Sequence, residues 1–277
     1  MTMPENSETP PGKYVRANGL DIYYEEQGQG QPLILIHGGS LNGASWKPYL
    51  AAFAERYRVI MPDSRGHGRS LNPEGMLSFR LMADDVAAFA SALGLDKPLI
   101  YGYSDGGQVA LEIGMRYPDL ALALIMGGTY IKLSEGGREF ARSLVGDEQS
   151  PEVDTEKFER ENPDYTGMLR QLHGPENWKT LLKQLKRVWN APLDYTPADL
   201  ARITAPSLVL LADRDELISV EEAARMYRQL PAAELAILPG SEHGDFLFSP
   251  AKIALVQPLI LDFLQRQAGK AAEAAPS

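Results

Sequence analysis

Short apolar runs recur along the chain, separated by segments whose apolar residues have helical spacing. Residues 33–36 form a continuous apolar run, which indicates a strand buried on both faces of a sheet. Residues 20–26 mix apolar and polar positions, as expected for a half-buried strand. Further strands are predicted at residues 57–61, 98–101, 121–126, 207–211 and 234–238.

Amphipathic segments between these runs predict helices. In residues 77–95 the apolar positions follow a helical period and place Asp84 and Asp85 on the polar side. Similar patterns occur at residues 220–230 and 251–267. Strands that alternate with helices predict an α/β fold, in which helices cover both faces of a mostly parallel sheet.

Residues 130–197 interrupt this alternation. The segment is rich in Glu, Lys, Arg and Gln and contains no strand-like run, while Trp178, Leu181 and Leu185 have helical spacing. We predict a helical insertion that packs over the catalytic edge as a lid or cap. The alternative is an exposed helical excursion with no role in a site.

The predicted domain organisation follows from these patterns. A core domain comprises residues 13–129 and 198–268, and the insertion at 130–197 forms the cap. The polar, proline-bearing residues 1–12 and the alanine-rich residues 269–277 are predicted to be flexible tails.

Composition narrows the class of partner. The 277-residue chain has a formal net charge of −10, which argues against nucleic acids and anionic membrane surfaces as partners. The absence of cysteine excludes disulfides, thiolate metal sites and a cysteine nucleophile. Neither a secretory signal nor an apolar run of about 18 residues is visible. These features predict a soluble cytoplasmic protein and say little about its substrate.

The motif Gly102-Tyr103-Ser104-Asp105-Gly106 lies between a predicted strand and a predicted helix. In this context Gly-x-Ser-x-Gly predicts a nucleophile elbow, a strained turn that holds the serine hydroxyl away from the sheet. A Cβ at either glycine would collide with the turn. The alternative is a glycine-rich connection with an incidental serine.

A serine nucleophile needs a base, and the chain has four histidines: His37, His67, His173 and His243. His243 follows the last predicted strand, so it belongs on the same sheet edge as Ser104. We predict that His243 is the base, against the alternative of a solvated loop histidine. His37 is expected to shape its own loop.

Three acids follow the strand at 207–211 and compete to orient the base. We favour Asp215, with Asp213 as the second choice, because Asp213 leaves the strand directly and can fix the turn, for example by pairing with Arg214. Glu216 is expected to point to solvent. The resulting chain order is Ser, Asp, His.

Acyl transfer also requires N–H donors for the developing oxyanion. The Asp105 backbone N–H follows the nucleophile directly and supplies one donor. The second is expected from the loop after residues 33–36, with Gly39 as the first choice and Ser40 as the neighbour that can replace it. A second polar loop, residues 63–70, is interpreted as a structural turn.

These motifs, in this order, resemble the α/β-hydrolase superfamily with a helical cap over about residues 14–267. The resemblance implies an eight-stranded sheet, a Ser–His–Asp triad, and no cofactor or metal. The matching motifs are His37-Gly38-Gly39, Asp63-Ser64-Arg65-Gly66-His67-Gly68-Arg69-Ser70, the Ser104 elbow, Asp215 and His243.

The predicted reaction is hydrolysis of a small carboxylic ester or lactone through an acyl-enzyme on Ser104. Epoxide hydrolases and haloalkane dehalogenases resemble this fold but have Asp as the nucleophile. C–C bond hydrolases of ring-cleavage products use serine, yet commonly carry Trp soon after the catalytic His, where this chain has Gly244. A non-enzymatic ligand-binding homologue is the remaining alternative.

The sequence Ser104-Asp105-Gly106-Gly107 also resembles the elbow of valacyclovir-hydrolase-like esterases. We hypothesise that the Asp105 carboxylate faces the pocket and accepts a cationic substrate group. The alternative is that it satisfies N–H groups of the helix, where an anion gains about 0.3–1 kcal/mol. Further candidates for substrate contact or pocket lining are Ser40, Tyr103, Trp46, Phe140, His173, Trp178 and Trp189.

Overall fold

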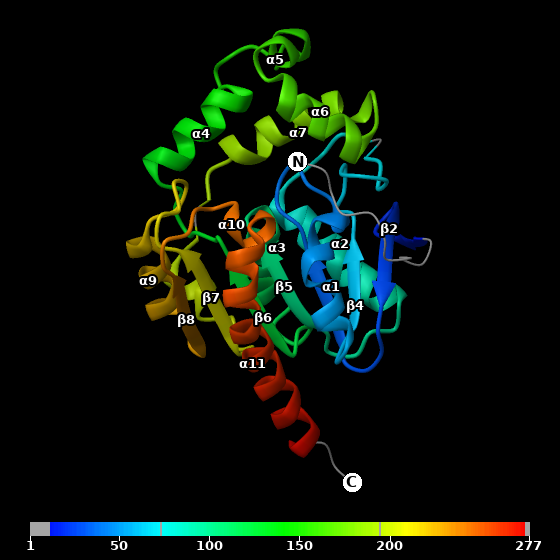
Figure 1. Ribbon diagram of the computed structural model, residues 1–277, viewed down its shortest axis with the longest axis vertical. Coiled ribbons are helices and arrows are strands. Elements are labelled where there is room, and N and C mark those ends of the chain that lie inside the picture. Colours follow the sequence, from blue (N-terminus) through cyan, green and yellow to red (C-terminus); the bar gives the residue numbers. More distant parts are fainter. Residues whose placement is uncertain (1–11, 73, 194, 275–277) are drawn as a thin grey trace.

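An eight-stranded sheet runs through the centre of the protein (Figure 1). The structure is a computed structural model that describes residues 12–72, 74–193 and 195–274. The strand order is β1-β2-β4-β3-β5-β6-β7-β8, in which β2 pairs antiparallel with its neighbours β1 and β4 and all other neighbouring strands are parallel. The predicted mostly parallel, eight-stranded sheet is confirmed. The strands are β1 (Lys13–Ala17), β2 (Leu20–Gln27), β3 (Pro32–Ile36), β4 (Arg58–Pro62), β5 (Leu99–Tyr103), β6 (Ala123–Gly127), β7 (Ser207–Ala212) and β8 (Ala233–Leu238).

Helices cover both faces of this sheet, which explains the continuous apolar runs. Successive side chains of a strand point to opposite faces, so Leu33 and Leu35 enter one core while Ile34 and Ile36 enter the other. The core around Ile34 contains α2 (Phe79–Ala92), α3 (Asp105–Arg116) and α9 (Val220–Gln229); that around Leu33 contains α1 (Lys47–Ala54), α10 (Asp245–Phe248) and α11 (Pro250–Ala274).

A group of helices in the described residues between β6 and β7 lies beyond one end of the sheet (Figure 1). They are α4 (Glu135–Val145), α5 (Thr155–Glu161), α6 (Pro163–His173) and α7 (Asn177–Asn190), referred to below as the helical insertion. A short helix, α8 (Pro197–Leu200), leads back into β7. The insertion has a small core of its own, formed by Val145, Phe158, Leu169, Trp178 and Leu182.

Several parts of the chain differ from the sequence-based expectation. Strand β1 was not anticipated because it lies at the edge of the sheet and most of its residues are exposed. The short α1, which follows a 3-10 turn (Gly43–Trp46), was also missed. The flexible tail predicted from residue 269 is corrected, since α11 continues to Ala274 through an alanine-rich segment that favours helix. Residues 1–11 and 275–277 of the predicted tails lie outside the described residues.

Asp85 was expected on the polar side of α2, but it is buried and accepts bidentate hydrogen bonds from Arg65. The Arg65 Nε and Nη2 atoms lie 2.8 and 2.6 Å from the two carboxylate oxygens. Asn18 donates a further hydrogen bond to Asp85 at 2.7 Å. Arg65 therefore joins the polar loop 63–70 to α2.

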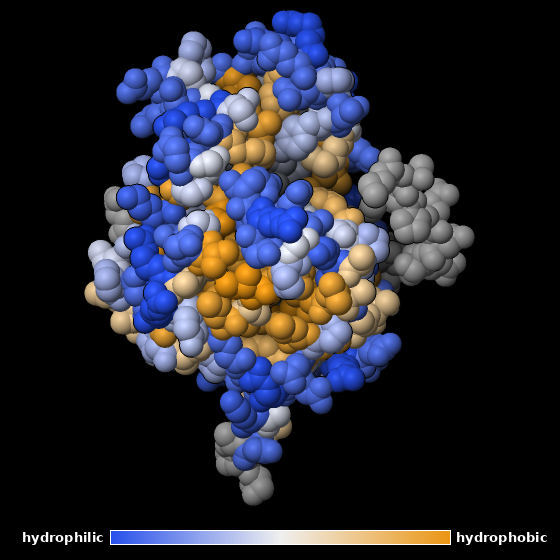
Figure 2. All heavy atoms as spheres, turned by 60° about the vertical axis from the view of Figure 1, so that its left-hand side comes forward, coloured by the Kyte–Doolittle hydropathy of each residue, from blue (hydrophilic) through white to orange (hydrophobic). Residues whose placement is uncertain are grey.

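The surface of the core carries apolar side chains below the helical insertion (Figure 2). In the C-terminal helices Phe248, Leu255 and Leu259 are exposed. Within the described ranges, none of the helices combines the length and the hydrophobicity required to cross a bilayer.

Removing the Asp85 carboxylate tests the buried ion pair. Asp85→Ala leaves the Arg65 charge buried without its partner, and we expect the free energy of unfolding to fall by about 3–5 kcal/mol. Asp84→Ala is the matched control on the same helix, because Asp84 pairs with Arg116 at the surface; its expected cost is about 1 kcal/mol or less. Urea denaturation measures both, and equal losses would contradict the assignment.

Candidate active site

Ser104 occupies a tight turn between β5 and α3. Its φ of 56° and ψ of −121° lie in a region that non-glycine residues rarely adopt. A Cβ on Gly102 would overlap the Gly106 carbonyl oxygen, and one on Gly106 would overlap that of Ile36. The predicted collision at both glycines is confirmed, and the turn projects Ser104 from the carboxyl end of β5.

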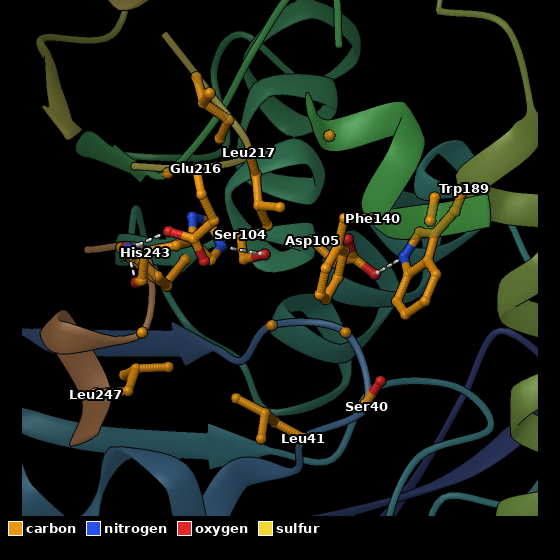
Figure 3. A pocket seen from close by; sticks show the side chains of 18 of the residues that line it. Ser40, Leu41, Ser104, Asp105, Phe140, Trp189, Glu216, Leu217, His243 and Leu247 are labelled. Atoms are coloured by element: carbon orange, nitrogen blue, oxygen red, sulfur yellow. Dashed lines mark hydrogen bonds between the residues drawn. The ribbon is translucent and has the colours of Figure 1, made fainter. Parts of the chain in front are cut away.

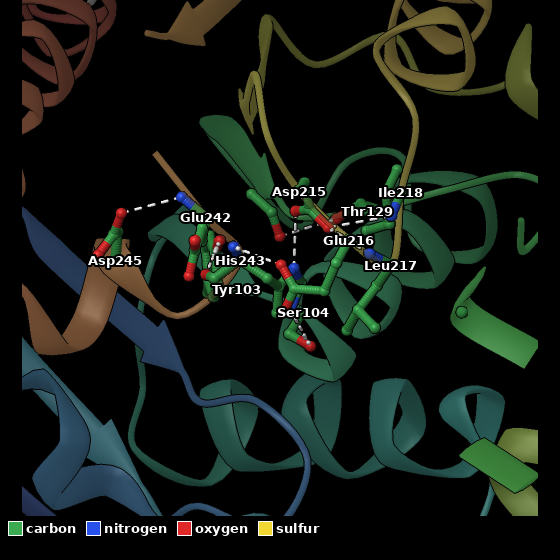
Figure 4. Close-up of polar contacts among 12 residues, drawn as sticks. Tyr103, Ser104, Thr129, Asp215, Glu216, Leu217, Ile218, Glu242, His243 and Asp245 are labelled. Atoms are coloured by element: carbon green, nitrogen blue, oxygen red, sulfur yellow. Dashed lines mark hydrogen bonds and ion pairs between the residues drawn. The ribbon is translucent and has the colours of Figure 1, made fainter. Parts of the chain in front are cut away.

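The structure brings Ser104, His243 and Asp215 together (Figure 4). His243 Nε2 lies 3.0 Å from Ser104 Oγ, and His243 Nδ1 lies 2.7 Å from Asp215 Oδ2. The other Asp215 oxygen accepts the N–H groups of Leu217 and Ile218, each at 3.0 Å. Because the carboxylate accepts from Nδ1–H, Nε2 is left free to accept the serine proton.

Two neighbours fix the backbone of His243. The Tyr103 hydroxyl donates to the His243 carbonyl oxygen at 2.6 Å, and Glu216 Oε2 accepts from the His243 N–H at 3.2 Å. Tyr103 lines the pocket, and its hydroxyl is engaged in positioning His243. Glu216 also lines the pocket, where the sequence had suggested only solvent.

Asp213, the second choice for the orienting acid, has a different partner. Its Oδ1 accepts the Ser241 N–H at 3.0 Å. Backbone hydrogen bonds from Gly240 and Ser241 lower the pKa of the Asp213 carboxyl. Asp213 thus holds the turn that leads to His243, with Ser241 as its partner in place of Arg214.

The loop after β3 lies against the nucleophile. A Cβ on Gly38 would be 3.2 Å from Ser104 Cβ, and Ser40 adopts a positive φ of 61°. Among the described residues, the backbone N–H groups of Gly39 and Asp105 donate to no protein acceptor. Both predicted oxyanion donors are therefore available to a ligand.

Two buried histidines, each in a defined tautomer, form hydrogen bonds that hold this loop in place. His37 Nε2 accepts the Ser64 N–H at 2.9 Å, so its Nδ1 carries the proton and donates to the Gly38 oxygen at 2.8 Å. His173 Nδ1 accepts the Gly68 N–H at 2.8 Å, so its Nε2 donates to the Ser40 oxygen at 2.9 Å.

Burial keeps these rings neutral. It lowers the pKa of His37 to about 4 and also lowers the pKa of His173. The His67 ring lies between them, at centroid distances of 5.0 and 5.8 Å. His173, a candidate for pocket lining, instead ties α6 to the loop after β3 through the Ser40 carbonyl oxygen.

A cavity of about 280 Å³ opens in front of Ser104 (Figure 3). Asp105 points into it and accepts the Trp189 indole N–H at 2.9 Å. Burial raises the pKa of the Asp105 carboxyl to about 6, although the Trp189 hydrogen bond opposes the shift. Of the predicted pocket aromatics, Phe140 and Trp189 line the cavity.

The other two predicted aromatics, Trp46 and Trp178, pack in the cores of the main domain and the insertion. The sequence-based prediction missed Tyr130 and Tyr165, which line the cavity. The sequence could have indicated Tyr130 as a lining residue, because it follows the end of a predicted strand. Tyr165 lies in α6, and no sequence pattern marked it as a lining residue. Its hydroxyl donates to Ser40 Oγ at 2.7 Å, so Ser40 is partly engaged.

The lining of this cavity is mostly apolar, with two carboxylates, Asp105 and Glu216, and neither Lys nor Arg among the described residues. In the same part of the chain, no group of three or more His, Asp or Glu side chains is arranged to bind a metal. The arrangement combines an activatable hydroxyl, a base and two N–H donors beside an apolar cavity.

Comparison with known proteins agrees with this geometry. Residues 33–254 match the alpha/beta hydrolase family. A putative non-heme chloroperoxidase from Synechocystis sp. is 29% identical over 275 residues, covering 89% of this chain and 95% of that protein. The 2-hydroxy-6-oxo-6-phenylhexa-2,4-dienoate hydrolase of Burkholderia cepacia is 28% identical over 270 residues, covering 87% and 93%.

A solved structure shares the fold at lower identity. The crystal structure of E-2-(acetamidomethylene)succinate hydrolase aligns with a TM-score of 0.74 and 20% identity, covering 92% of this chain and 99% of that one. At this identity the likeness establishes the architecture alone.

The buried His37 predicts acid sensitivity. Its folded pKa of about 4 lies below the value near 6.5 for an unfolded histidine, so the unfolded state binds more protons between these pH values. Stability is therefore present above pH 6.5 and is lost as the pH falls towards 4, by about 3 kcal/mol.

Urea denaturation of wild type and His37→Gln at pH 7 and pH 4 measures this contribution. We expect the stability advantage of the wild type over the variant to shrink by about 3 kcal/mol at the lower pH. The comparison cancels the titration of the shared carboxylates. An advantage that stays constant would show that His37 is not held neutral.

Proposed function

The chain belongs to the alpha/beta hydrolase family, and we propose that it is a serine hydrolase that cleaves small-molecule carboxylic esters or lactones. The observation that carries the proposal is the continuous set of hydrogen bonds from Ser104 through His243 to Asp215. This arrangement suits acyl transfer, in which the serine needs a base and the base needs an orienting carboxylate.

In the proposed mechanism, Ser104 Oγ attacks the substrate carbonyl carbon while His243 Nε2 takes the hydroxyl proton. The Gly39 and Asp105 N–H groups stabilise the oxyanion, and removal of one such donor typically costs about 2.7–4 kcal/mol. His243 then protonates the leaving alkoxide. Water, deprotonated by His243, attacks the acyl-enzyme and releases the acid and free Ser104.

Asp215 has a separate role in this mechanism. Its carboxylate keeps the Nδ1–H tautomer of His243 and stabilises the imidazolium that forms in each step. Because its second oxygen is held by two backbone N–H groups, the carboxylate has a fixed orientation towards the ring.

The helical insertion serves in this proposal as the cap, within the predicted boundaries 130–197. It contributes Phe140, Ala141, Tyr165, Met168 and Trp189 to the cavity lining. The cap therefore determines much of the substrate choice, while the loops after β3, β5, β7 and β8 supply the chemistry. No resident cofactor is part of the proposed reaction.

Charge in the cavity favours neutral or cationic substrates. Its described lining has two carboxylates and neither Lys nor Arg, and an anion placed there would lack an opposite charge. We therefore assign Asp105 as the group that accepts a cationic substrate substituent, with Ser40 as a nearby polar contact.

Hydrolysis of a C–C bond is the second candidate, and it is favoured by the name of the Burkholderia cepacia relative. That substrate is a dienoate, whose carboxylate would need a cationic partner. The lack of Lys and Arg in the described lining makes this reaction a poorer match than ester hydrolysis.

A substrate panel tests the reaction class. Neutral p-nitrophenyl esters, lactones, aminoacyl esters and a 2-hydroxy-6-oxohexadienoate should be assayed with wild type and Ser104→Ala. We expect ester or lactone turnover that falls by at least roughly 10³-fold in the variant. Turnover that survives in Ser104→Ala would overturn the mechanism, and cleavage of the dienoate alone would favour C–C hydrolysis.

A binder would behave differently in the same experiment. It would show saturable binding of an ester without turnover, and a fluorophosphonate probe would leave Ser104 unlabelled. Labelling of wild type and absence of labelling in Ser104→Ala is the result expected for the enzyme.

Asp105→Asn tests the recognition of a cationic group. The backbone N–H is retained, and we expect the preference for an aminoacyl over a matched acyl ester to fall about tenfold, or ~1.4 kcal/mol. Since the Asp105 pKa is about 6, the wild-type preference should rise between pH 5 and pH 7 as the carboxylate ionises.

Glu216→Gln is the matched control for this test, because it removes the other carboxylate of the cavity lining. A preference that falls in Glu216→Gln and stays unchanged in Asp105→Asn would move cation recognition to Glu216. No change in either variant would end the assignment of a carboxylate to substrate recognition.

A further inference from the structure

A second cavity, of about 400 Å³, adjoins the catalytic cavity and is not used by the proposed mechanism. Its lining is mostly polar and carries both charges, in contrast to the apolar catalytic cavity. The residues found only in this second lining include Lys132, Arg138, Arg142, Asp147, Glu148 and Asn190.

Four residues line both cavities and therefore form the wall between them: Tyr130, Leu133, Ala141 and Trp189. Trp189 has the largest side chain of the four and comes from the last turn of α7. Its neighbours in the chain, Asn190 and Ala191, continue the lining of the second cavity.

The Trp189 indole reaches from the insertion to the catalytic loops. Its Nε1 donates to Asp105 Oδ2 at 2.9 Å, and an added Cβ on Gly39 would lie 2.9 Å from its Cζ2 atom. The ring thus lies against Asp105 (Figure 3) and close to Gly39, the two residues proposed to donate to the oxyanion. The hydrogen bond to a carboxylate fixes its orientation.

We infer that Trp189 is a specificity-determining residue: anchored by Asp105, its indole closes the catalytic cavity against the second cavity and limits the length of the acyl group. The inference rests on the proposed ester hydrolysis. Because the second cavity is polar, the substrates excluded by the wall are long acyl groups that end in a polar group.

Two variants distinguish the effect of the indole's volume from the effect of its hydrogen bond to Asp105. Trp189→Ala removes both and joins the two cavities. Trp189→Phe keeps an aromatic ring but removes the N–H donor, so the ring loses its tie to Asp105. Leu193 lines the second cavity but not the catalytic one, and Leu193→Ala is the matched truncation on the far side of the wall.

The experiment compares kcat/KM for p-nitrophenyl 8-hydroxyoctanoate with that for p-nitrophenyl butyrate. We expect the ratio of the two to rise at least tenfold in Trp189→Ala, to rise about threefold in Trp189→Phe, and to stay at the wild-type value in Leu193→Ala. Circular dichroism verifies folding, and Trp189→Leu replaces the alanine variant under the same criterion if that variant does not fold.

Two results would overturn the inference while ester hydrolysis stands. One is a ratio in Trp189→Ala within twofold of the wild type, and the other is an equal rise in Leu193→Ala. If the wild type hydrolyses neither ester, the proposed function fails, and calorimetric binding of the neutral amides butyramide and 8-hydroxyoctanamide decides the inference.

In that binding measurement, Trp189→Ala should improve the affinity for 8-hydroxyoctanamide relative to butyramide at least tenfold. An unchanged relative affinity would overturn the inference independently of any activity.

Discussion

The site depends on the close approach of three backbone segments at Ser104. The strained turn brings α3 against the end of β3, and the carbonyl oxygens of Ile36 and Gly106 occupy the space that a Cβ at Gly106 or Gly102 would need. Only glycine allows this distance. The same approach places the Asp105 N–H and the loop with Gly39 on one side of the nucleophile. A looser turn would separate the hydroxyl from the N–H donors on which acyl transfer depends.

The loop after β3, which contains Gly39 and Ser40, is held from outside by buried polar groups in fixed protonation states. His37 and His173 each accept one backbone N–H and donate to one backbone oxygen. Protonation would convert the accepting nitrogen into a donor, so the loop geometry requires neutral rings. Burial supplies that condition by lowering the pKa of both histidines. A buried polar network of this kind is stable only when its members are satisfied.

The contacts made by the insertion converge on two neighbouring segments, the loop after β3 and the turn at Ser104. His173 and Tyr165 of α6 bond to Ser40, and Trp189 of α7 bonds to Asp105. The residues proposed to select the substrate thus also support the residues proposed to stabilise the oxyanion. A movement of the insertion would change both, which couples specificity to rate in this arrangement. Truncation of the wall at Trp189 therefore needs a control such as Leu193 that lies outside the catalytic cavity.

The local sequence determined the features that depend on periodicity and on short motifs. Runs such as residues 33–36 marked strands buried on both faces, and the spacing around Ser104 marked a turn that only glycine allows. Exposed edge strand β1 carried too weak a pattern, because an edge has one partner and little burial. Tertiary structure alone decided the partners of polar side chains: Asp85 pairs with Arg65, which lies 20 positions earlier in loop 63–70, and Asp105 pairs with Trp189, which lies 84 positions away in the chain. Such contacts are set by packing between elements, which local periodicity does not encode.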